Sequence, residues 1–295
     1  MHIGFMIQNE SMLAHGKLLM RSLEKTKSES IRIMVPETEM DLVQELRAAY
    51  PEPNILVMPF SIPERYRKFP FVDKLLGAAE AENTVEGTLL WMDTDSIVFE
   101  DLSVLELNES VVFAYRPVDK KLVGCEEGEP LTAFWQQIYS AFELEDDFAP
   151  MKTGVEELNI RPYFNAGFFI LRTERGILQF WRDRFFTIIE HEAMHAYFED
   201  HVLFKIFIHQ AVLTGAVLAS TRESERKLLP EKVNYPIYFH DQHPIHDSVH
   251  TSDDLISCRY DTYFNQELEE QNFIFSDSVE PWIDAEALKL GWFYE

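Results

Sequence analysis

The chain has 295 residues, of which 46% are hydrophobic and 26% charged, a composition typical of a folded protein with a sizeable core. Its 51 acidic residues outnumber its 26 basic ones, and the formal charge of −25 disfavours binding to nucleic acid or to an anionic membrane surface. No run of 18 apolar residues occurs, so we expect no transmembrane segment, and a strand-like start leaves no room for a signal peptide. Two cysteines, Cys125 and Cys258, are too few for a disulfide scaffold and favour a reducing, cytoplasmic location.

Short apolar runs alternate with helical patterns through the first third of the chain. Strands are predicted at 3–7, 31–35, 54–58 and 88–92, and helices at 14–23, 39–50 and 71–81. This alternation is typical of βαβ crossovers. It predicts an α/β fold with a mostly parallel central sheet and helices on both faces.

The second half of the chain is less regular. Two further strands are predicted at 111–115 and 166–171, on either side of a long polar stretch that carries a helical pattern at 131–142. Helical spacing returns at 177–188 and again at 201–218. After Pro230 the chain is rich in histidine, and we expect loops there.

Two carboxylates, Asp93 and Asp95, directly follow the fourth predicted strand and precede the apolar run 97–99. Ligands of open parallel sheets bind beyond the carboxyl ends of the strands. Two aspartates at this spacing can converge on Mg²⁺ or Mn²⁺, which commonly bridges carboxylates to a diphosphate. The position after a buried strand favours such a site over the alternative, a solvated acidic turn.

Two blocks of sequence resemble the glycosyltransferases of the GT-A fold, particularly the family-8-like group. The segment 89–102, which contains Asp93 and Asp95, is similar to the metal-binding block of that family. The segment 163–171 is similar to its aromatic-N-[SA]-G-apolar strand, and Leu229-Pro230 with Asn234-Tyr235 is similar to its L-P…N segment. The resemblance covers about residues 1 to 255. The oligomeric state is left open.

The resemblance implies a nucleotide-sugar donor, usually a UDP-sugar, and transfer to an unnamed acceptor with retention of anomeric configuration. It also implies Mn²⁺ or Mg²⁺ held by Asp93, Asp95 and a later histidine, for which His250 is preferred and His240 is the alternative. Lys74 is expected to contact the donor phosphates, with an ordinary position on a helix surface as an equal alternative. The residues expected to bind the donor are Gln8, Asn9, Glu10, Lys74, Asp93, Thr94, Asn165, Ala166 and Gly167.

No clear linker interrupts the chain, so we expect a single domain over 1–295. Within it, 1–115 is expected to be the nucleotide-sugar-binding half and 116–255 the acceptor and sugar half. The remainder, 256–295, is expected to be a C-terminal extension.

One departure from the family concerns the residues near the sugar. The family typically carries Asp-Gln on a later helix, whereas the best match in this chain is His209-Gln210. Gln210 can still offer its amide to the reacting face, so both residues are expected at the catalytic centre. A histidine in place of the acid leaves a non-catalytic nucleotide-sugar-binding protein as an alternative.

A rival motif, H-E-A-M-H beginning at His191, matches the H-E-x-x-H pattern of zinc peptidases. His191 and His195 would lie one helical turn apart, Glu192 could activate a zinc-bound water, and His201 has the spacing of a third ligand. However, Phe198 stands where that class needs a glycine to turn the helix. A zinc metallopeptidase is therefore the less favoured alternative, and ordinary helix-surface histidines are the simpler interpretation.

Overall fold

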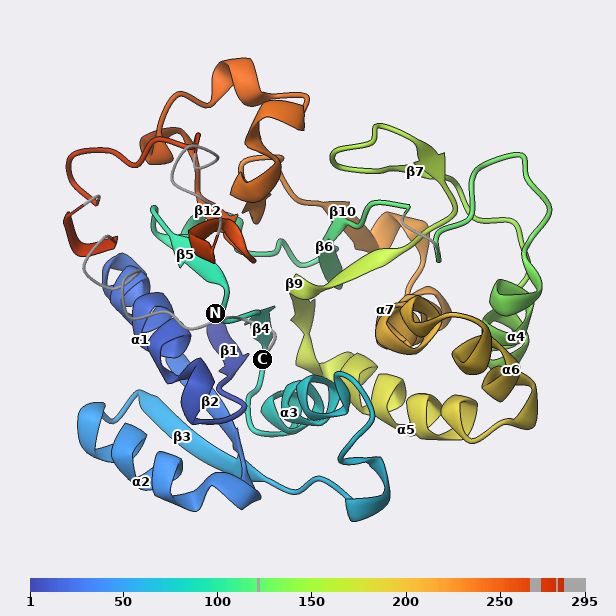
Figure 1. Ribbon diagram of the computed structural model, residues 1–295, viewed down its shortest axis with the longest axis horizontal. Coiled ribbons are helices and arrows are strands. Elements are labelled where there is room, and N and C mark those ends of the chain that lie inside the picture. Colours follow the sequence, from blue (N-terminus) through green and yellow to red (C-terminus); the bar gives the residue numbers. More distant parts are fainter. Residues whose placement is uncertain (121–122, 266–271, 280, 284–295) are drawn as a thin grey trace.

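The computed structural model describes residues 1–120, 123–265, 272–279 and 281–283 (Figure 1). Within these residues the centre of the fold is a seven-stranded sheet in the order β10-β6-β9-β4-β1-β2-β3. Every neighbouring pair is parallel except the two made by β9, which runs antiparallel to β4 and β6. The prediction of a mostly parallel sheet is therefore confirmed. The strands are β1 (His2–Met6), β2 (Ser30–Pro36), β3 (Ile55–Phe60), β4 (Thr88–Met92), β6 (Phe113–Pro117), β9 (Phe164–Arg172) and β10 (Arg226–Leu228).

Helices cover both faces of this sheet, as expected. Successive residues of β4 point to opposite faces, and Leu90 and Met92 pack with α1 (Leu13–Ser22) and α2 (Met40–Ala49). Leu89 and Trp91 belong to the core on the other face. The helices of that second core are α3 (Val72–Asn83), α4 (Ala133–Ala141), α5 (Ile177–Ile189), α6 (Glu192–Asp200) and α7 (Val202–Ser220).

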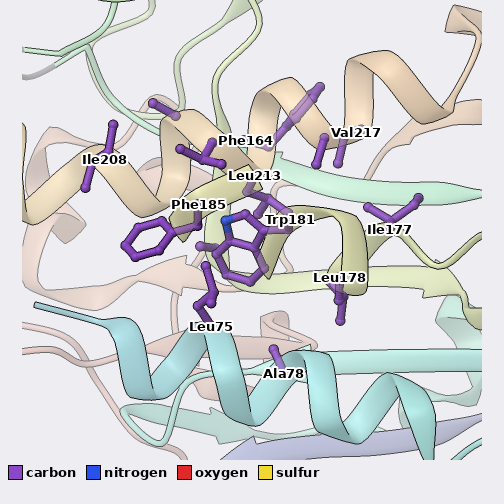
Figure 2. Close-up of a cluster of buried hydrophobic side chains, with 14 of the residues drawn as sticks. Leu75, Ala78, Phe164, Ile177, Leu178, Trp181, Phe185, Ile208, Leu213 and Val217 are labelled. Atoms are coloured by element: carbon purple, nitrogen blue, oxygen red, sulfur yellow. The ribbon is translucent and has the colours of Figure 1, made fainter. Parts of the chain in front are cut away.

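Trp181 of α5 lies at the centre of the second core, among side chains such as Leu75 of α3 and Leu213 of α7 (Figure 2). Its ring is fully buried, and its indole N–H donates a hydrogen bond of 2.8 Å to the backbone carbonyl of His209. A buried indole needs such a partner for its one polar atom. This bond fixes the part of α7 that carries His209 and Gln210.

Helix α7 is long and apolar enough, by length and composition alone, to cross a membrane. In the described structure 61% of the stretch is buried inside the protein, where it contacts β9 and α5. These contacts are those of a core helix.

The chain after Pro230 contains more regular structure than expected. β12 (Ser257–Arg259) pairs antiparallel with β5 (Ser96–Val98) and parallel with β11 (Tyr235–Pro236). This small sheet brings the start of the predicted C-terminal extension beside the segment that follows β4. Residues 266–271, 280 and 284–295 of that extension lie outside the described residues. Two short strands also form in the polar stretch, β7 (Met151–Lys152) and β8 (Asn159–Ile160).

Candidate active site

A cavity of about 260 Å³ opens beyond the carboxyl ends of β1 and β4. Because β9 runs antiparallel to β4, with Phe168 opposite Met92, the first residues of β9 lie at the same edge of the sheet. The cavity is therefore lined by Gln8 after β1, by Asp93 and Asp95 after β4, and by Asn165 of β9. This edge is where ligands of open α/β sheets bind.

The position of Asp93 is fixed by two contacts. Its backbone N–H donates to the carbonyl of Gly167 at 2.8 Å, and its carboxylate Oδ2 forms an ion pair with Lys74 Nζ at 2.8 Å. A β-carbon at Gly167 would stand only 2.3 Å from that oxygen. Gly167 is thus required because its missing side chain leaves room for the Asp93 carboxylate.

The carboxylate of Asp95 is buried beside Arg259, with 3.5 Å between Asp95 Oδ2 and Arg259 Nε. Burial raises the pKa of Asp95 to about 7, although the charge of Arg259 opposes this shift. Arg259 also contacts Asp261 at 2.8 Å and donates to the hydroxyl of Tyr238. Burial lowers the pKa of Arg259, but the neighbouring acidic groups outweigh it and the pKa is raised, so Arg259 stays charged.

The structure brings neither of the two histidines predicted as metal ligands to the aspartates. His250 is exposed, and its backbone N–H donates to Asp254; His240 bonds through Nδ1 to the hydroxyl of Tyr235. Neither histidine lines the cavity. Across the part of the chain that the structure describes, no group of three His, Cys, Asp or Glu side chains could hold a metal ion.

The side chain beside Asp95 is instead Arg259, and a guanidinium has no lone pair to offer a metal. The described residues therefore do not fit the three-ligand metal site that the family resemblance implies. The assignment of His250 to such a site is corrected accordingly.

His209 and Gln210 do reach the cavity, as expected. His209 is buried, its ring stacks on Phe71 with centroids 4.5 Å apart, and its Nδ1 lies 2.8 Å from the carbonyl of Ile206. Because a carbonyl only accepts, Nδ1 carries the proton and Nε2 is an acceptor. Burial, with a smaller effect of Lys74, lowers the pKa of His209 well below 6.5, so the ring is neutral. Gln210 Oε1 accepts from the backbone N–H of Ala166 at 3.3 Å.

The expected donor-binding residues divide into two groups. Gln8, Lys74, Thr94, Asn165 and Gly167 line the cavity together with Asp93 and Asp95.

The other three do not line it. Asn9 caps a short 3₁₀ helix, Glu10–Met12, by accepting from the backbone N–H of Met12. Glu10 lines a separate groove with Lys17, and Ala166 contributes its backbone N–H to Gln210. Gln8 is thus the one residue of this loop that lines the cavity, and a contact of Asn9 or Glu10 with the nucleoside stays a prediction.

A second cavity, of about 440 Å³, adjoins the first and shares Asn165, Phe207, Gln210 and Arg259 with it. Its lining includes Arg116, which is buried and donates to the carbonyl of Leu229 at 2.9 Å. Sequence reasoning missed Arg259 and Arg116. Arg259 is far from Asp95 along the chain, and only the pairing of β12 with β5 brings the two together.

The H-E-x-x-H motif does not form a zinc site. His191 precedes α6 and caps it, with Nδ1 accepting from the N–H of Ala193, and His201 caps α7 by accepting from Leu203. The helix therefore begins after His191 and ends before His201. His191 and His201 therefore act as helix caps, which agrees with the simpler interpretation of ordinary helix histidines and does not support the less favoured zinc metallopeptidase.

Comparisons with known proteins agree with this geometry. No curated protein matches the chain. The galactosyltransferase LgtC, solved in complex with donor and acceptor sugar analogs, superposes with a TM-score of 0.54 at 14% identity, over 100% of this chain and 98% of LgtC. The glycosyltransferase GlyE of Streptococcus pneumoniae TIGR4 superposes with a TM-score of 0.53 at 15% identity, over 97% of this chain and 64% of GlyE. The chain thus spans less than two thirds of the length of GlyE.

Identities this low establish the fold alone, and that fold is the GT-A fold of glycosyltransferases, as the sequence predicted. A family model describing the Rhodobacterales glycosyltransferase domain matches residues 3–212, which is well over half of the chain. The chain therefore belongs to the Rhodobacterales glycosyltransferase domain family.

Proposed function

We propose that this glycosyltransferase takes its sugar from a nucleoside-diphosphate donor, with UDP as the expected nucleotide, and transfers it to an acceptor in the adjoining cavity. One observation carries the proposal. Three neighbouring strands, β1, β4 and β9, place their functional residues in a row along one edge of the sheet. A nucleotide sugar is itself a row of nucleoside, diphosphate and sugar.

The row of residues matches the chemistry of these three parts. Gln8 at the β1 end offers an amide to the nucleoside, and Lys74 with the aspartates after β4 forms the charged centre. Asn165 and Gln210 at the β9 end offer amides that suit sugar hydroxyl groups.

The second cavity supports an acceptor site because it meets the first at Asn165 and Gln210. An acceptor hydroxyl placed there would face the anomeric carbon of a sugar held at the β9 end. The new bond forms between that hydroxyl oxygen and the anomeric carbon. The bond from this carbon to the diphosphate breaks with its electron pair on the leaving phosphate, and the hydroxyl proton passes to water. The structure of LgtC with donor and acceptor sugar analogs supports a two-substrate site on this fold.

Retention of anomeric configuration is the outcome that the family resemblance implies, and we propose it for this chain. Proton NMR of the first product formed, recorded before the product mutarotates, distinguishes retention from inversion. A divalent metal is common among GT-A glycosyltransferases, but the pairing of Arg259 with Asp95 does not favour it in this chain.

The first experiment measures thermal stability with UDP, ADP, GDP and CDP, followed by turnover of the matching nucleotide sugars. A ligand at about 100 times its dissociation constant stabilises the fold by roughly 2.7 kcal/mol, a shift that is readily measured. Stabilisation by one nucleoside diphosphate and release of that nucleotide from its sugar would support a transferase. Binding without any release, with water or with a broad panel of sugar acceptors, would instead indicate the non-catalytic binding protein. No stabilisation by any of the four, either in EDTA or in excess Mn²⁺ or Mg²⁺, would overturn the proposed donor class.

The matched variants for turnover are Asp95→Asn and Asp247→Asn. Asp95 is buried in the cavity, whereas the side chain of Asp247 is 95% exposed and lines neither cavity. We expect Asp95→Asn to abolish turnover with the fold intact and Asp247→Asn to leave it unchanged. Full activity of Asp95→Asn would contradict the assignment of this cavity.

A further inference from the structure

We propose that Arg259 and Lys74 bind the diphosphate of the donor directly and take the place of a divalent cation. The proposal rests on the proposed function, because it concerns the same donor in the same cavity. In this proposal the positive charge beside the aspartate pair comes from the side chain of Arg259 rather than from a bound metal ion.

Arg259 lies where the two cavities meet and lines both of them. β12 carries it, and the antiparallel pairing of β12 with β5 places Arg259 opposite Ser96, next to Asp95. A guanidinium is permanently charged, presents a planar set of N–H donors, and binds phosphate with two parallel hydrogen bonds. Arg259 therefore has the chemistry and the position of a phosphate-binding residue.

The contact between Arg259 and Asp95 is incomplete. The two groups form an ion pair at 3.5 Å, but Arg259 Nε and Asp95 Oδ1 are both buried atoms without a hydrogen-bond partner among the described residues. A buried donor or acceptor without a partner is costly. Because both atoms are closed to solvent, a phosphate oxygen would be met by the N–H groups of the guanidinium that border the cavities, and the unsatisfied atoms show only that Asp95 does not fully engage Arg259.

Lys74 provides the second cation, on the other side of the aspartate pair. Its ammonium lies 2.8 Å from Asp93 Oδ2 and 4.9 Å from the centre of the Phe71 ring, which holds the side chain over the cavity. Each of the two aspartates is therefore already paired with a protein cation. The diphosphate of a nucleotide sugar carries one negative charge on each phosphate. Lys74 and Arg259 would bind it by turning N–H groups away from Asp93, Asp95 and Asp261 and towards the phosphate oxygens.

A divalent ion between the aspartates would lie next to Arg259 and be repelled by it. The same guanidinium stabilises the additional negative charge that the diphosphate gains when the sugar leaves. The two roles that a metal ion has in this reaction class are thus both available from Arg259 and Lys74.

The test is UDP binding to the whole chain by isothermal titration calorimetry, in EDTA and in excess Mn²⁺ or Mg²⁺. We expect the dissociation constant in EDTA to lie within threefold of the value with metal. This measurement uses the wild-type protein and does not depend on the folding of a variant. UDP binding that is lost in EDTA and restored by metal would overturn the inference while leaving the proposed function intact. No binding of UDP, ADP, GDP or CDP under either condition would overturn both.

Three variants identify the cations. Arg259→Gln and Lys74→Gln should each weaken UDP binding in EDTA at least tenfold. Arg21→Gln is the matched control, because Arg21 pairs with Glu24 on the surface of α1 and does not line either cavity. Circular dichroism and thermal unfolding establish that each variant is folded. If Arg259→Gln does not fold, the UDP affinity of Lys74→Gln tests the proposal. Wild-type affinity in a folded Arg259→Gln or Lys74→Gln protein would contradict the proposal.

Discussion

Gly167 and Asp93 approach each other so closely that a β-carbon at Gly167 would lie 2.3 Å from the carboxylate oxygen Oδ2 of Asp93. The same oxygen forms the ion pair with Lys74. The end of β4 and the start of β9 are therefore packed so closely at the site that no side chain fits at position 167.

Gly167→Ala should displace the Asp93 carboxylate, separate it from Lys74 and lower the affinity for UDP at least tenfold. Gly77→Ala is the control, since its new β-carbon would contact neighbours only at an ordinary 3.4 Å and alanine favours the helix by about 0.5–1 kcal/mol. Calorimetric titration with UDP checks both. Unchanged affinity in Gly167→Ala would show that the Asp93 carboxylate does not need this position.

Gln210→Ala should reduce kcat at least tenfold and leave UDP affinity within twofold of the wild type. Gln210 borders both cavities and is held to β9 through Ala166, so it acts at the sugar rather than at the nucleotide. Gln44→Ala, on the exposed side of α2, is the control. The measurement is initial-rate kinetics with calorimetric binding, and an unchanged rate would remove Gln210 from the catalytic centre.

His209→Gln should leave the shape of the pH–rate profile unchanged between about pH 6 and 8. Burial lowers the pKa of His209 well below 6.5, so the ring is neutral at every pH in this range and has no proton to gain or lose. Glutamine keeps an acceptor oxygen but loses the ring that stacks on Phe71 and holds Nε2 in place, so kcat/KM should fall by about twofold to tenfold. Disappearance of a limb of the profile near neutral pH would show instead that His209 titrates during turnover.

Glu82→Gln should remove a pH-dependent loss of stability. Glu82 of α3 accepts from the N–H groups of Leu178 at 3.1 Å and Gln179 at 2.9 Å, at the start of α5. Burial nevertheless raises its pKa from 4.5 to about 7. Between these two values the folded protein binds the proton and the unfolded chain does not, so the free energy of unfolding falls as the pH rises.

The fall attributable to Glu82 is at most about 3 kcal/mol between pH 4.5 and 7, from the relation of 1.36 kcal/mol per pKa unit. Urea unfolding of the wild type and of Glu82→Gln across this range measures the difference. The exposed Glu45→Gln variant is the control. Parallel curves for the wild type and Glu82→Gln would show that Glu82 has an ordinary pKa.

The order of the first elements could be predicted from the sequence because each strand and helix there has a regular apolar pattern. The strands at 3–7, 31–35 and 88–92 correspond to β1, β2 and β4 of the structure. The pattern after Pro230 is too short for such a prediction, since β11 and β12 consist of only two and three residues. Strands of this length are defined by their partners rather than by their own periodicity.

The sequence by itself determined the mostly parallel sheet, because local apolar patterns predict its strands and helices. It also determined the place of Asp93 and Asp95 at the edge of the sheet, because the two aspartates directly follow a predicted strand. Only the tertiary structure decided what surrounds the aspartates. It placed Lys74 beside Asp93 and Arg259 beside Asp95, left His250 on the surface and made His191 a helix cap. The physical reason is that Arg259 reaches Asp95 through the pairing of β12 with β5, a contact between distant segments that no local pattern encodes.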